Sequence, residues 1–237
     1  MTLPVSILFV KISRLSQGNL NLIISGLITT LLFFISSCGH LPDNEDLLNY
    51  ENATASMVLS EENKLIGKFF YEDRTNISSD QIPWHLKASL IATEDVRFFE
   101  HRGNDPRSLL RVLVKTVLFN DRSAGGGSTI TQQLAKNMFG RKNSEVMPVL
   151  TSKFREIILA RRLEKTFSKE EILTLYLNTV SFGENAYGIE AASARFFNKR
   201  TELLKIEESA VLIGMLKANT YYNPRLHPEN AKTRRYG

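Results

Sequence analysis

The sequence predicts a mainly α-helical domain with a short β-hairpin on its N-terminal side, behind an apolar N-terminal segment. Helical periodicity dominates from Pro83 onward, and β-prone runs precede it. The chain has 237 residues, 43% of them apolar and 23% charged. This composition excludes a disordered chain, a collagen and a polytopic membrane protein. The single cysteine excludes a disulfide framework and a cysteine-based zinc site.

The N-terminal segment predicts the compartment. An apolar run over residues 20–37 follows a stretch that carries Lys11 and Arg14, an order typical of a secretory signal or a membrane anchor. Its basic flank would stay in the cytoplasm, which places the chain after residue 38 on the extracytoplasmic side. We therefore expect a tethered, non-cytoplasmic domain.

Cys38 ends this run, after an aliphatic and two small residues. The pattern resembles the lipobox of bacterial lipoproteins, which implies lipidation of Cys38 and cleavage before it. The alternative is an uncleaved single-span anchor with an incidental cysteine. Both interpretations treat residues 1–38 as a signal or anchor.

The hairpin is predicted from two β-prone runs, Met57–Leu59 and Leu65–Phe70, that flank a polar pentapeptide. Residues 39–55 are polar and lack periodicity, which predicts a linker before a domain that spans residues 56–237.

Helix starts are marked by capping residues. Asp105 followed by Pro106 is typical of an N-cap and a first helical residue. Thr129 with Gln132, and the run that begins at Ser168, fit capping boxes. The predicted helices begin at Pro106 and at Ser128-Thr129, and further helices cover about 149–165, 169–178, 186–197 and 206–217.

Glu94 and Asp95 form the first candidate chemical site, between an apolar stretch and Phe98. A carboxylate beside apolar groups suits proton transfer near neutrality. The alternative is a helix-end carboxylate in an ion pair with Arg97 or Arg102.

Two further segments carry polar residues. Glycines at 125–127 lead into Ser128 and Thr129, which leaves backbone N–H groups to meet an anion; the alternative is an exposed loop. It is not a Walker A loop, because no Gly-Lys-Ser/Thr follows. Lys153 and Glu156 share a helix face, and the alternative for them is a solvated surface pair.

In this order, the segments closely resemble the peptidoglycan glycosyltransferase (transglycosylase) family, as in monofunctional biosynthetic transglycosylases and the N-terminal domain of bifunctional penicillin-binding proteins. The resemblance runs from about residue 54 to the end of the chain. The family normally continues further, so we expect a C-terminally truncated or short variant. It rests on four motifs: Glu94-Asp95 with Phe98, His101, Gly103 and Asp105; Gly126 to Asn137; Lys153 with Glu156 and Leu163-Glu164-Lys165; and Ser168 to Asn178 with the following Phe182-Gly183 and Tyr187 to Ala192.

The resemblance implies a lysozyme-like helical domain with a small membrane-facing jaw. It implies polymerisation of glycan strands from lipid II, with inversion and release of polyprenyl pyrophosphate. Glu94 matches the general base, and Glu156 a second carboxylate near the pyrophosphate and a divalent metal (Mg²⁺ or Mn²⁺). The substrate-binding residues it implies are Asp95, Phe98, His101, Gly103, Ser128, Thr129, Gln132, Gln133, Lys136, Asn137 and Lys153.

The implied partners are lipid II, the growing strand, the membrane and other cell-wall synthesis proteins, with no nucleic acid. The third motif departs from the family pattern, because Ser152 stands where an arginine is usual and residues 145–149 lack another. A catalytically weak paralogue that binds lipid II or the cell wall is therefore one alternative. A lysozyme-like lytic enzyme is the other.

Overall fold

The computed structural model describes residues 41–52, 54–70, 72–111, 126–140 and 148–236, together with six residues between 22 and 29. Most described residues are helical, which confirms the predicted fold class. The chain divides into two compact units, residues 1–41 with 142–155, and residues 42–141 with 156–237. The elements are α3 (Asn44–Leu48), β1 (Ser56–Leu59), β2 (Leu65–Phe69), β3 (Asp73–Arg74), α4 (Trp84–Glu94), α6 (Ile130–Phe139), α7 (Pro148–Thr166), α8 (Lys169–Thr179), β4 (Ser181–Gly183), β5 (Ala186–Tyr187), α9 (Ile189–Phe197), α10 (Ile206–Met215) and α11 (Pro228–Tyr236), with short 3-10 turns at Ser79–Gln81 and Thr201–Leu203.

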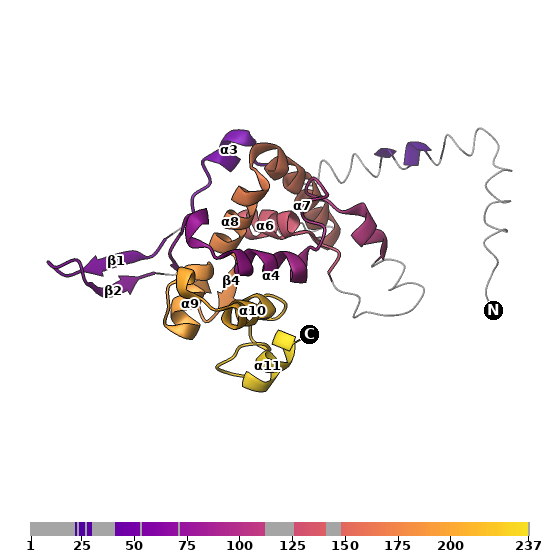
Figure 1. Cartoon of the computed structure of the whole chain (residues 1–237). Coiled ribbons are helices and arrows are strands. Elements are labelled where there is room, and N and C mark those ends of the chain that lie inside the picture. The colour runs from indigo at the N-terminus through magenta and orange to yellow at the C-terminus, as the bar shows by residue number, and fades with distance from the viewer. Residues whose placement is uncertain are drawn as a thin grey trace. The chain divides into compact units, whose positions relative to one another are not determined.

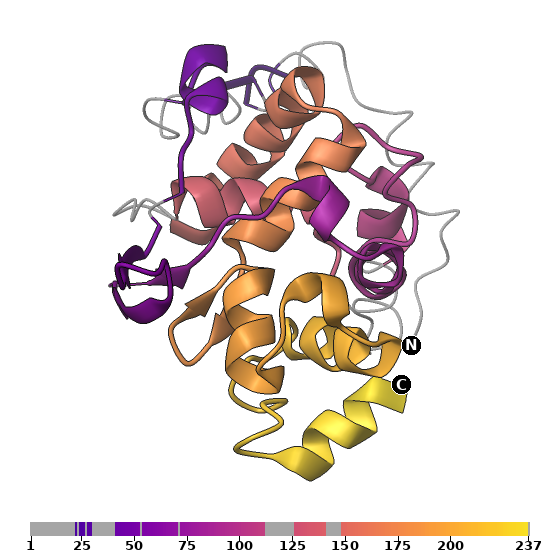
Figure 2. The ribbon, with the colours of Figure 1, turned by 60° about the vertical axis from the view of Figure 1, so that its left-hand side comes forward.

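Leucine-rich helix faces build the core of the larger unit. Helix α6 packs on α8, and α10 packs on both α4 and α11, an arrangement that can be followed in Figure 1 and, after rotation, in Figure 2. Leu86 and Leu90 of α4, Leu134 of α6 and Ile172 of α8 are fully buried. Because α4 and α6 are both held by this core, the ends of these helices are fixed where Glu94 and Thr129 lie.

The predicted hairpin is confirmed. β1 pairs antiparallel with β2, with a register shift between Val58 and Leu59. The apolar side chains of Met57, Ile66 and Phe69 are exposed.

The second sheet was not predicted from the sequence, because its strands have only two or three residues. Its order is β3-β5-β4, with β3 parallel to β5 and β4 antiparallel to it. The helix predicted from residue 186 begins at Ile189 instead, because residues 186–187 form β5 and Gly188 follows with φ +79°. A Cβ on Gly188 would lie 2.8 Å from the Asn178 carbonyl oxygen, so a glycine is required there.

The segment predicted as a linker contains a helix. Asp43 and Asp46 form a capping box at the start of α3, and Leu47 is buried. Arg162 donates a hydrogen bond to the carbonyl of Pro42. Five residues are too few to show helical periodicity, so only the capping pair could have revealed this element.

Several expectations fall outside the described residues. Cys38, most of the apolar run, residues 121–125 and the helix beyond residue 111 are among them. Within the described part of the chain, no helix combines the length and hydropathy needed to cross a membrane.

Replacing Ser168 by alanine should destabilise the domain by about 1 kcal/mol. Its hydroxyl accepts the Glu171 amide proton while the Glu171 side chain accepts the Ser168 amide proton, as the predicted capping box requires. Thermal unfolding of Ser168→Ala measures the loss. Thr174→Ala on the same helix removes only a bond to the Glu170 carbonyl and should not lower the melting temperature; an equal loss in both variants would contradict the capping role.

Candidate active site

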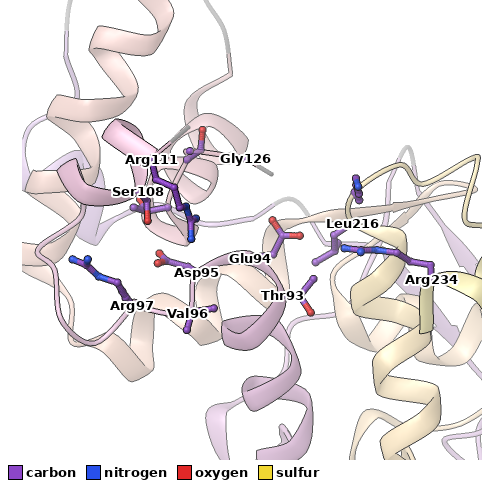
Figure 3. A pocket seen from close by; sticks show the side chains of 14 residues that line it. Thr93, Glu94, Asp95, Val96, Arg97, Ser108, Arg111, Gly126, Leu216 and Arg234 are labelled. Atoms are coloured by element: carbon purple, nitrogen blue, oxygen red, sulfur yellow. The ribbon is translucent and has the colours of Figure 1, made fainter. Parts of the chain in front are cut away.

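A cavity of about 600 Å³ opens where α4 ends and α6 begins. Figure 3 shows Glu94 and Asp95 within it, with Arg97 and Arg111 on one side and Arg234 on the other. The described residues that line it are Thr93, Glu94, Asp95, Val96, Arg97, Ser108, Arg111, Gly126, Gly127, Ser128, Thr129, Leu216, Lys217 and Arg234. The first two motifs of the sequence therefore meet at one cavity.

Glu94 is the last residue of α4 and is half-buried. Its Oε2 accepts a hydrogen bond of 2.8 Å from Nε2 of Gln133 on α6. The other side of that amide, Oε1 of Gln133, accepts a hydrogen bond of 2.9 Å from the Tyr176 hydroxyl on α8. Burial, and then the charge of Glu94, raise the pKa of Tyr176, so this hydroxyl stays protonated and acts as a donor.

Asp95 joins the first motif to the start of α6. Its buried carboxylate contacts Nε2 of His101 at 2.9 Å and accepts a hydrogen bond of 3.1 Å from the backbone N–H of Ile130. One carboxylate therefore fixes the loop after α4 and the first turn of α6 together, which holds Glu94 beside Gln133.

A second set of hydrogen bonds also joins the loop after α4 to the start of α6. Thr129 is the N-cap of α6, where it accepts from the Gln132 amide and donates to the Gly103 carbonyl at 2.6 Å. Only this half of the predicted capping box is present, because the Gln132 side chain donates to Asn104 instead. Thr129 and Gln132 are both buried, and Thr129 also lines the cavity.

Phe98 lies in the core. Its ring is 0% exposed, and Nζ of Lys169 lies 4.2 Å from the ring centroid. The same ammonium donates to the His101 carbonyl and to Glu164. Phe98 and His101 therefore attach the loop that follows Glu94 to the core.

The predicted helix start at Asp105 is confirmed, because its carboxylate accepts the Arg107 amide proton and residues 106–111 are helical. Arg97 pairs with Asp105 at 3.1 Å and with Glu100 at 3.2 Å. The alternative in which Arg97 pairs with Glu94 is therefore wrong.

Burial raises the pKa of Asp105, but hydrogen bonds from Ser108 and the charge of Arg97 outweigh this effect and lower the pKa overall.

The remaining predicted residues lie elsewhere on the described elements. Lys136 is half-buried in the last turn of α6. Asn137 lines a second cavity of about 320 Å³, with Tyr50, Glu72, Arg74, Met138, Thr179, Ser181 and Tyr187. The structure therefore separates Asn137 from the cavity that holds Glu94.

Glu156 lies on α7 and is 7% exposed, so the interpretation of Lys153 and Glu156 as a solvated surface pair is wrong. Lys153 is half-buried and belongs to the smaller unit. Among the described residues, no three His, Cys, Asp or Glu side chains gather into a group that could hold a metal ion.

Three cationic residues of the cavity were missed in the sequence: Arg111, Lys217 and Arg234. Lys217 follows α10 and Arg234 lies on α11, more than a hundred residues after Glu94. Arg234 packs its Cγ close to Gly214, where an added Cβ would lie 3.1 Å away. Only the packing of α10 against α4 and α11 reveals that Lys217 and Arg234 belong to the site.

Comparison with known proteins identifies the family of this chain. The family model described as Transglycosylase matches residues 62–236. The chain belongs to this transglycosylase family. Penicillin-binding protein 1A of Aquifex aeolicus (strain VF5) is 38% identical over 222 residues, which cover 94% of this chain and 30% of that protein.

Penicillin-binding protein 1F of Bacillus subtilis (strain 168) is 39% identical over 181 residues, which cover 76% of this chain and 25% of that protein. The transglycosylase chain thus spans less than a third of the length of these relatives. The crystal structure of penicillin-binding protein 1A from Haemophilus influenzae aligns over 78% of this chain and 17% of that one, at 19% identity and a TM-score of 0.40.

Replacing Gly103 by alanine should destabilise this transglycosylase domain by about 2–4 kcal/mol. Gly103 has φ +86°, and a Cβ there would lie 2.6 Å from the Ala160 carbonyl oxygen. Thermal unfolding measures the effect, with Gly67→Ala as the control, because nothing lies within 4 Å of a Cβ at Gly67. A Gly103→Ala variant as stable as the control would contradict the close approach of this loop to α7.

Proposed function

We propose that this chain polymerises peptidoglycan glycan strands from lipid II, by inverting glycosyl transfer that releases polyprenyl pyrophosphate. The observation that carries the proposal is the placement of Glu94 in the cavity, with one carboxylate oxygen held by Gln133 and cationic side chains around it. Membership of the transglycosylase family supports it.

Glu94 is proposed as the general base. A sugar hydroxyl is a weak nucleophile, so a positioned base that takes its proton in the transition state accelerates attack, typically by 10²–10⁴-fold. Gln133 occupies Oε2 of Glu94, and no other hydrogen bond to this carboxylate is found among the described residues. Oε1 is therefore the oxygen we assign to the proton of the acceptor 4-hydroxyl.

The leaving pyrophosphate needs positive charge as its own negative charge develops. Arg111, Lys217 and Arg234 line the cavity, and Arg97 is held there by Asp105 and Glu100. These side chains supply cations at fixed positions around Glu94, which suits a doubly charged diphosphate linker and favours its arrival by electrostatic attraction.

A divalent metal is proposed to bind only together with substrate. Glu156 offers a single carboxylate, and the described residues do not complete a site around it. Mg²⁺ is often held by one or two carboxylates plus substrate phosphates, and the family resemblance assigns Glu156 as such a carboxylate. When bound, the ion would neutralise charge on the leaving group.

We further propose that the domain works at the outer face of the cytoplasmic membrane, tethered through residues 1–38. A polyprenyl-linked substrate is confined to the bilayer, and the order of a basic flank followed by an apolar run is typical of such a tether. Other cell-wall synthesis proteins are the partners we expect there.

A second candidate is a paralogue that binds lipid II without turnover. Ser152, buried on α7, stands where the resemblance implies an arginine. One assay distinguishes the two functions, in which labelled lipid II is incubated with the chain, divalent metal and detergent. A polymerase gives polymer, whereas a paralogue without turnover gives a retained complex with unreacted lipid II. Soluble fragments from purified sacculi would instead indicate a lytic enzyme.

Glu94→Gln should lower the rate of lipid II polymerisation by at least about 10²-fold, because the amide cannot accept the hydroxyl proton. The melting temperature should change little, since Gln keeps the shape of the side chain. Gel analysis of strands made from labelled lipid II measures the rate. Glu207→Gln, an exposed position on α10, is the matched control and should polymerise normally; normal activity of Glu94→Gln would refute the role of base.

Lys217→Ala should raise KM for lipid II about three- to tenfold, because one cavity cation that attracts the diphosphate is lost. Steady-state polymerisation at several salt concentrations measures it, and the defect should shrink as salt screens the wild-type attraction. Lys232→Ala, an exposed residue of α11 outside the cavity lining, is the control. Equal KM values for the two variants would exclude Lys217 from substrate binding.

A further inference from the structure

Three side chains from three helices form one continuous hydrogen-bonded series that ends at Glu94. The Tyr176 hydroxyl of α8 donates to Oε1 of Gln133 at 2.9 Å. Nε2 of the same Gln133 amide, on α6, donates to Oε2 of Glu94 at 2.8 Å. The series begins in the core, because Tyr176 is 0% exposed, and ends in the cavity, which Glu94 lines.

The direction of each bond follows from the chemistry of the groups. A carboxylate only accepts, so the Gln133 amide must turn its NH₂ toward Glu94 and its oxygen toward Tyr176. The flipped amide would place its oxygen against the carboxylate and its NH₂ against the hydroxyl. The carboxylate excludes that flipped orientation, and the Tyr176 hydroxyl donates to the amide oxygen in the orientation that remains, which strengthens the arrangement that serves Glu94. Burial raises the pKa of Tyr176, which keeps this hydroxyl a donor.

We propose that Tyr176 is a positioning residue of the reaction, which fixes the Gln133 amide so that Glu94 is held by one carboxylate oxygen and presents the other to the acceptor hydroxyl. The inference rests on the proposed role of Glu94 as base. Catalytic groups must stay near their productive geometry, and a glutamate at a helix end has several rotamers to lose. A hydrogen bond anchored in the core removes that freedom before substrate arrives.

Loss of the hydroxyl gives a specific expectation. Tyr176→Phe keeps the ring that fills the core but leaves Oε1 of Gln133 without its donor. The Gln133 amide then rotates so that its oxygen can accept a hydrogen bond from another donor. Glu94 loses its fixed orientation as a result. We expect kcat for lipid II polymerisation to fall about tenfold with KM nearly unchanged, because the groups that bind the diphosphate are untouched.

The decisive experiment is a double-mutant cycle on kcat with Gln133→Ala. If Tyr176 acts through Gln133, then Tyr176→Phe should lower kcat less than twofold in the Gln133→Ala background. A tenfold fall in both backgrounds, or full kcat in Tyr176→Phe, would overturn the proposal. Ser193→Ala is the matched control: it removes another buried hydroxyl bond, to the Lys199 carbonyl, and should leave kcat unchanged.

NMR spectroscopy tests the role of Tyr176 without any measurement of polymerisation, so this test does not depend on the proposed function. The side-chain amide signals of Gln133 in a nitrogen-15 NMR spectrum, assigned by their loss in Gln133→Ala, should shift in Tyr176→Phe and stay in place in Ser193→Ala. Unchanged signals would overturn the proposal. If the wild-type chain makes no polymer, the proposed function fails, while these signals still decide whether Tyr176 orients the amide.

Discussion

The site depends on the contacts that the carboxylate of Asp95 makes with His101 and with the backbone of Ile130. Through these contacts, the end of α4 and the start of α6 are tied by one buried anion. An unpaired buried carboxylate would be costly, but here the helix N-terminus and the imidazole stabilise its charge. With that junction closed, Glu94 and Gln133 lie within hydrogen-bond distance.

The rest of the larger unit supports this junction from several sides. Thr129 links the cap of α6 to the Gly103 carbonyl, and Lys169 holds the His101 carbonyl from α8. Helix α10 packs on α4 and α11, so that Lys217, which follows α10, and Arg234 of α11 reach the cavity. The acidic and cationic parts of the cavity thus come from separate helices fixed by one core, which gives a preorganised electrostatic environment.

The sequence predicted those elements whose stabilising contacts join residues close to one another in the chain. The caps at Asp105 and Ser168 were readable because each involves neighbours in sequence. Lys217 and Arg234 could not be predicted, since only tertiary packing brings them to Glu94. The parallel pairing of β3 with β5 joins residues more than a hundred positions apart, and two-residue strands leave no periodicity. The predicted lipidation of Cys38 and the jaw remain predictions.

The most direct test of the account is the stereochemistry of the bond that we propose the purified chain makes from lipid II. A base at Glu94 that deprotonates the acceptor while the diphosphate leaves from the opposite face must invert the anomeric carbon. NMR of the product should therefore show new β-1,4 linkages from an α-linked donor. An α-linked product, or no new glycosidic bond under conditions where lipid II binds, would contradict the account.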